Sequence, residues 1–280
     1  MIDPTFPELK LHRLAMVQLV LTIFDLPDVK FQLKWLLLSR DRRDYEKKAA
    51  ALLRRLTRKL ECLELPSPVY NDVLFALHSM IQRTILYLKP IAWNLYKVTQ
   101  VNSPLPVSPP GQLEPLITPP NLEIQIEDLI ICLQWNQYGT IDTRRTFRKL
   151  HRLKKLPHTP IIYLEVFNLC LEDVIKDIWA NAPTEPLEEF KKTLADDLSI
   201  QKSEIIATYF AYRFMGRSEE LYFIIDRLIE MKVYPRSDKL LRQPTAEESM
   251  FRFAVYNGNY SAMRFFWDKL SEEERQRNLL

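Results

Sequence analysis

The chain of 280 residues contains only 4 glycines against 19 prolines, a balance that disfavours hairpin-rich β folds and glycine-rich nucleotide-binding loops. Its 47% hydrophobic and 27% charged residues are ordinary for a folded protein and argue against global disorder. The formal net charge of +3 makes no case for nucleic acid by itself. The three cysteines are far apart and odd in number, which is typical of free thiols in a reducing compartment, not of a disulfide framework or a zinc site.

Three helices are predicted near the start of the chain, over residues 10–24, 28–39 and 44–63. The first is nearly all apolar from Leu14 to Phe24, a pattern shared by signal peptides, membrane spans and buried helices. The stretch is too short to cross a bilayer, Gln18 interrupts it, and no small-residue cleavage site follows. We therefore expect a buried helix that ends at Pro27, and no membrane span.

The third helix has a basic side and a leucine-rich side. Its basic residues are Lys47, Lys48, Arg54, Arg55, Arg58 and Lys59, and its leucines are Leu52, Leu53, Leu56, Leu60 and Leu63. A solvated surface face explains this pattern. The sharper interpretation is a face that contacts phosphates.

Further helices are predicted over residues 69–82 and 90–98, and a proline-rich stretch follows at residues 102–120. Proline at this density blocks helix and strand and favours extended polyproline II. We expect a linker or long exposed loop; a ligand for a proline-recognising domain is the alternative. The predicted regions are an N-terminal helical region (1–100), the proline-rich segment (101–122) and a helical array (123–280).

The most charged segment is the predicted helix over residues 143–155. One side carries Arg144, Arg145, Arg148, Lys149, Arg152 and Lys155, and the other carries Phe147, Leu150 and Leu153. This separation of charge indicates an anionic partner, with phosphate binding by the six basic residues as the hypothesis. His151, at the edge of the basic side, is interpreted as an ordinary surface histidine.

Beyond Pro160 the charge balance turns acidic. Asp196 and Asp197 could be read as a metal site or an acid–base pair. Adjacent side chains on a helix point about 100 degrees apart, however, so a helix-surface position is the better interpretation. Trp179 and Phe190 are predicted to be core residues.

A helix pair with a tight turn is predicted over residues 203–236. The first helix carries an apolar stripe containing Ile205, Tyr209 and Tyr212, and Gly216 is suited to the left-handed position just past its end. A second stripe follows after Ser218, a capping residue, and Pro235 stops the second helix. Such a pair cannot bury both stripes alone, which is the logic of a helical-repeat array.

The spacing of Gly216, Leu228 and Pro235 resembles the pentatricopeptide repeat, a unit of about 35 residues. Residues 126–157 are similar to a second copy. Its matching positions are Leu129, Ile130, Leu133, Gly139, Phe147, Leu150 and Pro157.

Two further stretches resemble parts of the same repeat. Residues 69–74 are similar to the opening of the family's first helix, and residues 251–270 follow its pattern with Gly258 at the turn. Residues 253–270 are also similar to the helix pair of an ankyrin repeat. They lack the Thr-Pro start and the closing glycine of that family, so we rank the ankyrin resemblance second.

The pentatricopeptide resemblance implies an α-solenoid that binds single-stranded RNA, with a mitochondrial location; cytoplasmic is the alternative, since no transit peptide is visible. In that family, polar residues near the start of each first helix select bases. Here those places fall near Ala207, Asp72 and Ile130. The repeats are therefore expected to keep the scaffold without the base code. Contacts are then either directed to the RNA backbone, through Arg144, Arg148, Lys149 and Arg152, or absent.

The alternative function is a protein-interaction scaffold, with Tyr209, Tyr212, Phe265 and Trp267 lining the binding surface. No nucleophile elbow, phosphate-binding loop, paired metal ligands or dinucleotide fingerprint occurs in the sequence. We expect an all-α solenoid of stacked antiparallel helix pairs that is not an enzyme and has no cofactor, metal or small-molecule substrate. No polar capping helix follows the last repeat, so a chain truncated at its C-terminus is also part of the expectation.

Overall fold

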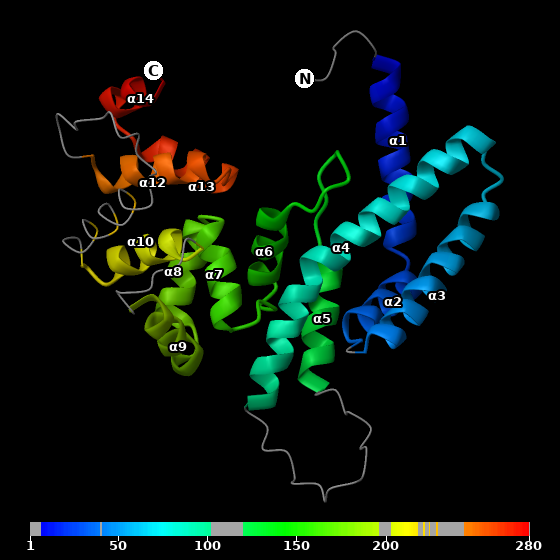
Figure 1. The fold of residues 1–280 in the computed structure, drawn as a ribbon, viewed down its shortest axis with the longest axis horizontal. Coiled ribbons are helices and arrows are strands. Elements are labelled where there is room, and N and C mark those ends of the chain that lie inside the picture. Colours follow the sequence, from blue (N-terminus) through cyan, green and yellow to red (C-terminus); the bar gives the residue numbers. More distant parts are fainter. Residues whose placement is uncertain are drawn as a thin grey trace, which may run out of the picture. The chain divides into compact units, whose positions relative to one another are not determined.

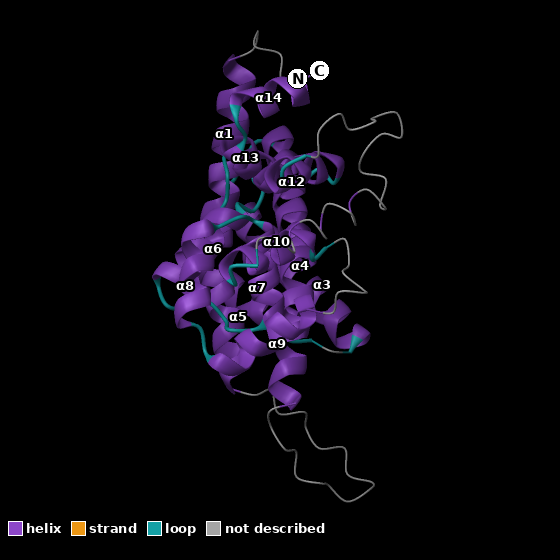
Figure 2. Ribbon diagram, turned by 90° about the vertical axis from the view of Figure 1, so that its left-hand side faces the viewer, coloured by secondary structure: helices purple, strands orange, loops and turns teal. Residues whose placement is uncertain are grey.

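The regular structure of the described residues is helical (Figures 1 and 2). The structure, a computed structural model, describes residues 7–39, 41–101, 120–195, 203–217, 221, 224, 228 and 244–279. Its helices are α1 (Pro7–Phe24), α2 (Pro27–Leu37), α3 (Arg42–Glu61), α4 (Ser67–Val101), α5 (Pro120–Cys132), α6 (Thr143–Arg152), α7 (Pro160–Asn168), α8 (Glu172–Asn181), α9 (Thr184–Ala195), α10 (Ile205–Phe214), α12 (Ala246–Tyr256), α13 (Tyr260–Lys269) and α14 (Glu272–Leu279). The predicted all-α class is confirmed for this part of the chain, where the only β-type pairing is an isolated bridge between Trp135 and Ile141.

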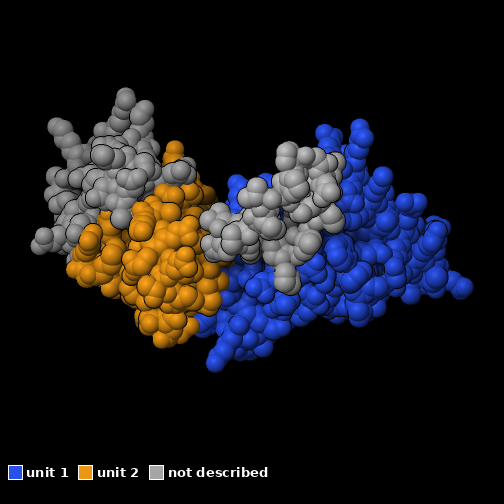
Figure 3. Space-filling model, turned by 90° about the horizontal axis from the view of Figure 1, so that it is seen from below, with its two compact units in different colours: residues 1–157 blue, residues 158–280 orange. Residues whose placement is uncertain are grey.

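The chain forms two compact units, residues 1–157 and residues 158–280 (Figure 3). The first unit carries 23 lysines and arginines against 15 aspartates and glutamates, a net charge of +8. The second carries 16 against 21, a net charge of −5. The small overall charge therefore hides a basic unit followed by an acidic one. The proline-rich segment that the sequence predicts to divide the chain lies mostly outside the described residues.

Helix α4 is continuous although it contains Pro90. Separate helices over residues 69–82 and 90–98 are predicted from the sequence, and this is wrong for the residues between them. Proline removes one backbone hydrogen bond, but Ile85, Leu88 and Ile91 are buried on both sides of it, and this burial outweighs the loss. The repeat-like stretch that begins at Val69 therefore contains one long helix, where the pentatricopeptide unit contains two.

The first unit is built around α2, α4 and α5. Helix α2 packs against α3 and α5, α4 packs against α1 and α5, and α6 packs against α5. The loop between α5 and α6 turns at Gly139, whose φ of 70° is left-handed. A Cβ atom there would lie 3.5 Å from the Met80 sulfur and 3.6 Å from Val17, so the loop lies close against α4 and α1.

The second unit is centred on α10, which packs against α7 and α9. A single apolar stripe is predicted on this helix, but every residue from Ile205 to Tyr212 is buried. A helix that is apolar on all sides belongs inside a fold. Tyr209 and Tyr212 are therefore core residues, and the prediction that they line a binding surface is wrong.

Three of the predicted turn residues, Gly139, Gly216 and Gly258, have a left-handed backbone conformation. Gly139 lies in a loop, and the other two lie at helix ends. Gly216 follows α10 with a φ of 70°, and Gly258 follows α12 with a φ of 65°. At each, two amide–carbonyl bonds close the helix end: Gly216 to Arg213 and Arg217 to Tyr212, and Gly258 to Val255 and Asn259 to Ala254. This is the Schellman arrangement. Pro157 is a buried residue in the segment that links α6 to α7 along the chain, and Pro235 lies outside the described residues.

Helix α6 ends in the same arrangement without a glycine. Lys154 has a φ of 55°, its amide bonds the His151 carbonyl at 2.9 Å, and the Lys155 amide bonds the Leu150 carbonyl at 2.9 Å. A left-handed conformation costs a non-glycine residue about 1–2 kcal/mol, partly offset by the greater unfolded-state freedom of glycine. We expect Lys154→Gly to raise the free energy of unfolding by about 0.5–1 kcal/mol. Urea unfolding checks this, and the exposed Lys176→Gly in α8 is the control that should lower it by about 1 kcal/mol.

A network of polar side chains holds α14 to α12. The sequence predicts no polar helix after the last repeat, and this is wrong, because α14 is a polar helix that follows α13. Ser271 and Glu274 form a capping box at the start of α14: the Ser271 amide donates to Glu274 Oε2 at 2.8 Å, and the Glu274 amide donates to Ser271 Oγ at 3.3 Å. The hydroxyl of Thr245, the N-cap of α12, donates to Glu274 Oε1 at 2.6 Å. Glu274 thus ties the beginnings of both helices together.

This network makes the second unit sensitive to acid. Burial by itself would raise the pKa of Glu274, but the hydrogen bonds from Thr245 and Ser271 and the charge of Arg277 outweigh it and lower the pKa below 4.5. A group whose pKa is lowered on folding stabilises the protein above its unfolded pKa, and this is lost as pH falls through the folded value. We expect Glu274→Gln to be less stable than the parent at pH 7. The difference should shrink as pH falls in an unfolding series from pH 7 to pH 3, and a constant difference would contradict the assignment.

Candidate functional site

Helix α6 carries five of the six basic residues that the sequence marks as phosphate-binding, and the sixth, Lys155, lies just beyond its end. The helix predicted over residues 143–155 is therefore wrong for its last three residues, because the chain turns at Lys154. Asp142 caps its start by accepting from the Arg145 amide at 3.0 Å, and Thr146, Phe147 and Leu150 are buried against the rest of the unit. Because this side of α6 packs against the protein, most of the basic side chains lie on the opposite side, toward solvent. The side chains of Arg145, Arg148, Arg152 and Lys155 are exposed, and those of Arg144 and Lys149 are half-buried.

Two of the six serve to hold α6 to α5. Lys149 Nζ donates to the Ile131 carbonyl at 3.1 Å, near the end of α5. Lys155 Nζ donates to Asp128 Oδ1 at 2.6 Å. The hydrogen bond to Asp128 and the negative charge of that carboxylate raise the pKa of Lys155. A third, Arg145, lies 3.4 Å from the capping Asp142 carboxylate, so the basic side of α6 is partly neutralised by the protein itself.

Helix α3 divides its basic residues between two sides. On the side toward α2, Asp28 lies 2.9 Å from Arg55 Nε and 3.1 Å from Lys59 Nζ. Burial would raise the pKa of Asp28, but the hydrogen bonds and positive charges of Lys59 and Arg55 together lower it. Lys48 similarly lies 2.6 Å from Asp44. These three cations are used in the packing of the unit.

The other side of α3 carries a row of exposed cations, which we call the α3 basic stripe: Arg43, Lys47, Arg54 and Arg58. Their spacing places them within a narrow arc along about 22 Å of the helix. Among the residues that the structure describes, none of the four has a carboxylate within ion-pair distance. A surface cavity of about 340 Å³ lies beside the stripe, lined by Gln32, Ala51, Arg54, Arg55 and Arg58.

The positive charge of the α3 basic stripe is less compensated by other groups of the protein than that of α6 and Lys155. Its guanidinium and ammonium groups remain available, whereas α6 shares half of its cations with α5 and with its own cap. The sequence marks α3 as basic but does not separate Arg54 and Arg58 from Arg55 and Lys59, because the pairing depends on Asp28 from another helix. A helical wheel drawn from the sequence cannot show which acidic residues of neighbouring helices lie beside each cation, because that depends on the tertiary structure.

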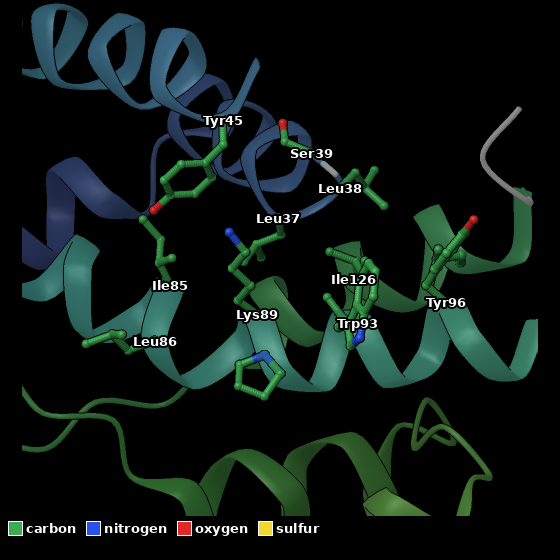
Figure 4. A pocket seen from close by; sticks show the side chains of 13 residues that line it. Leu37, Leu38, Ser39, Tyr45, Ile85, Leu86, Lys89, Trp93, Tyr96 and Ile126 are labelled. Carbon is green, nitrogen blue, oxygen red and sulfur yellow. The ribbon is translucent and has the colours of Figure 1, made fainter. Parts of the chain in front are cut away.

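A second feature of the first unit is an apolar groove of about 460 Å³. It lies among the end of α2, the start of α3, the middle of α4 and the start of α5. Its lining residues are Leu37, Leu38, Ser39, Tyr45, Ile85, Leu86, Lys89, Pro90, Ala92, Trp93, Tyr96, Leu122 and Ile126. Figure 4 shows Ile85, Lys89 and Tyr96 rising from α4 toward the side of the groove that holds Tyr45 and Ser39. The ammonium group of Lys89 lies 3.9 Å from the centre of the Tyr45 ring, in a cation–π contact.

The described residues contain no cluster of three or more histidine, cysteine, aspartate or glutamate side chains that could hold a metal ion. Cys132 and Cys170 are buried free thiols and Cys62 is an exposed one. Burial raises the pKa of Cys132, despite the opposing charge of Lys149, and so disfavours its reactive thiolate form. Asp196 and Asp197 lie outside the described part.

Within the same part of the chain, none of the helices combines the length and the apolar character needed to cross a membrane. Comparison of the chain with protein-family models, with curated proteins and with solved structures found no match.

Proposed function

We propose that the chain is a non-catalytic binding protein whose first unit binds single-stranded RNA through the sugar–phosphate backbone. The observation that carries the proposal is the α3 basic stripe, whose four cations lie along one side of a helix without carboxylate partners among the described residues. The net charge of +8 on the first unit supports it, since a basic face on a basic domain favours a polyanion.

The resemblance to pentatricopeptide repeats supports RNA as the polyanion. The helix pairs α5–α6 and α12–α13 each turn at a left-handed glycine, Gly139 or Gly258, as the resemblance expects. We propose that these pairs are degenerate repeats of an α-solenoid, and that the protein acts in organelle gene expression, with mitochondria as the location. Contacts to phosphates in place of bases fit the absence of a polar base-selecting residue at Ala207 and Ile130.

The test is binding of a fluorescent single-stranded RNA pool to the full chain at several salt concentrations. We expect Arg54→Glu/Arg58→Glu to weaken binding at least tenfold at low salt. Loss of two phosphate contacts should reduce the slope of log K against log salt by about 1.4. The control Lys192→Glu/Arg264→Glu makes the same change of net charge with exposed residues of the second unit and should leave binding within about twofold.

A second variant, Arg144→Glu/Arg148→Glu/Arg152→Glu, reports on α6. If it abolishes binding and the α3 variant does not, the RNA site lies on α6 and the α3 assignment is wrong. Absence of binding by the folded parent protein at low salt would overturn the RNA proposal altogether.

A second candidate function is a protein-interaction scaffold, which a different observation favours. Leu86 is 75% exposed and Trp93 is 49% exposed, and both border the apolar groove. Large apolar side chains grouped around a groove are typical of protein-binding surfaces.

A further inference from the structure

The outer side of α4 carries a row of exposed apolar residues, which we call the α4 apolar stripe: Phe75, Leu86, Pro90 and Trp93. Phe75 is 77% exposed, and with Leu86 and Trp93 it falls within about 20° of one line along the helix. Leu86 and Trp93 are seven residues apart, about 10 Å along the axis. Leu86 and Trp93 have the seven-residue spacing by which one helix packs against another, and Phe75 is separated from them by the polar Ser79 and Gln82.

The apolar groove lies directly beside this stripe and deepens it. Leu86, Pro90 and Trp93 belong to both, and the buried side chains of Leu37, Ile85 and Ile126 form the groove's floor. An apolar side chain from a partner would be removed from water there, as the central residues of tight interfaces are. Pro90 has no amide proton, so it cannot donate to the Leu86 carbonyl as other residues at this place in a helix do.

Cations flank the stripe and the groove. Arg83, Lys89 and Lys97 lie within about 80° of the same line on α4, and in the described part of the chain none of them has a carboxylate partner. The aromatic contacts of Lys89 with Tyr45 and of Lys97 with Trp93 hold two of these ammonium groups over rings without neutralising their charge. The only acidic residue in α4 is Asp72, near its start. Asp41 and Glu46 line a neighbouring cavity together with Lys89. The surface is therefore apolar along its centre, with positive charge at Arg83 and Lys97 and with charge that is partly offset near Lys89.

We propose that the α4 apolar stripe and its groove bind an amphipathic helix of a partner protein, with aspartate or glutamate residues flanking its apolar side. The proposal rests on the second candidate function and names its partner. The partner's apolar residues lie on Leu86 and Trp93, one of them enters the groove, and its carboxylates pair with Lys89 and with Arg83 or Lys97. A helix fits better than a strand because the described residues offer no sheet edge on which a strand could add.

The test uses two synthetic 18-residue helical peptides with the same leucine and tryptophan face. One has glutamates flanking that face and the other has lysines. Fluorescence anisotropy with the full chain should give binding of the glutamate peptide, and binding of the lysine peptide should be at least tenfold weaker. Trp93→Ala and Leu86→Ala should each weaken binding of the glutamate peptide about tenfold or more. Lys89→Glu should reduce or reverse the difference in affinity between the two peptides. These residues are exposed, so the variants keep the fold, which circular dichroism checks.

The exposed Tyr260→Ala in the second unit is the matched control and should leave peptide binding unchanged. Arg54→Glu/Arg58→Glu should also retain it, so that loss of RNA binding and loss of peptide binding are separate results. Equal binding of both peptides, or unchanged binding by Trp93→Ala, would overturn the proposal. Self-association of the chain that Trp93→Ala abolishes would also overturn it, because the occupant would then be a second copy.

Discussion

Replacing Phe210 with alanine is expected to lower the free energy of unfolding of the second unit by about 3–5 kcal/mol. Phe210 lies in the middle of α10, where it is almost fully buried. Its ring centroid is 6.0 Å from that of Phe167 on α7 and 5.4 Å from that of Phe265 on α13. It also contacts Tyr209, Phe214 and Phe266. The alanine leaves a cavity bordered by rigid rings, which collapse poorly into the space.

Hydrogen exchange is the measurement, because it reports on each unit separately. Amides of α7 and α10 should lose protection in Phe210→Ala, while those of α2 and α5 should keep theirs. Phe75→Ala is the matched control: the same substitution at a side chain that is 77% exposed, expected to change stability by less than about 0.5 kcal/mol. A loss below about 1 kcal/mol in Phe210→Ala would contradict the central position of this ring.

Replacing Glu248 with alanine is expected to lower the free energy of unfolding of the second unit by about 2–3 kcal/mol. Glu248 is only 2% exposed. Its Oε1 accepts from Arg252 at 3.2 Å and from Asn278 at 3.2 Å, and its Oε2 accepts from Arg277 at 3.0 Å. One buried carboxylate therefore joins α12 to two side chains of α14. Arg252 and Arg277 keep partial contact with water, which limits the penalty for leaving them unpaired.

The same substitution should release α14 more than the rest of the unit. We expect the amides of α14 to exchange rapidly in Glu248→Ala, and urea unfolding to give the size of the loss. Glu272→Ala, at a carboxylate on α14 that is largely exposed, should change stability by less than about 0.5 kcal/mol. Equal effects of the two substitutions would mean that the buried network does not hold α14.

Local features of the sequence were sufficient for much of the fold. The helical class follows from the apolar spacing and the shortage of glycine. The left-handed helix ends at Gly216 and Gly258 follow from the special freedom of glycine. The first helix follows from an apolar run too short to span a membrane, but the prediction that it is buried holds for one side only, since Val17, Val20 and Ile23 are buried and Leu14 is 45% exposed. Each of these signals is local in the sequence, so it can be recognised without knowing which other helices pack nearby.

Proline is the local signal that failed. Pro90 is read from the sequence as a helix boundary, but α4 continues through it. The loss of one hydrogen bond is a local cost, and the burial of Ile85, Leu88 and Ile91 against other helices is a non-local gain. The lost hydrogen bond can be predicted from the sequence, but the burial against other helices cannot.

The candidate site depended most on the packing of distant segments. Six cations on α6 look alike in the sequence, yet Lys149 and Lys155 are bound to α5, 18 and 27 residues away. On α3, Arg55 pairs with Asp28, while the preceding residue, Arg54, has no carboxylate within ion-pair distance in the described part of the chain. Periodicity assigns a charge to one side of a helix. A carboxylate from another helix decides whether that charge forms an ion pair within the protein or remains available to a partner. The helices and their ends can therefore be predicted from the sequence, whereas the candidate binding surfaces can be identified only from the tertiary structure.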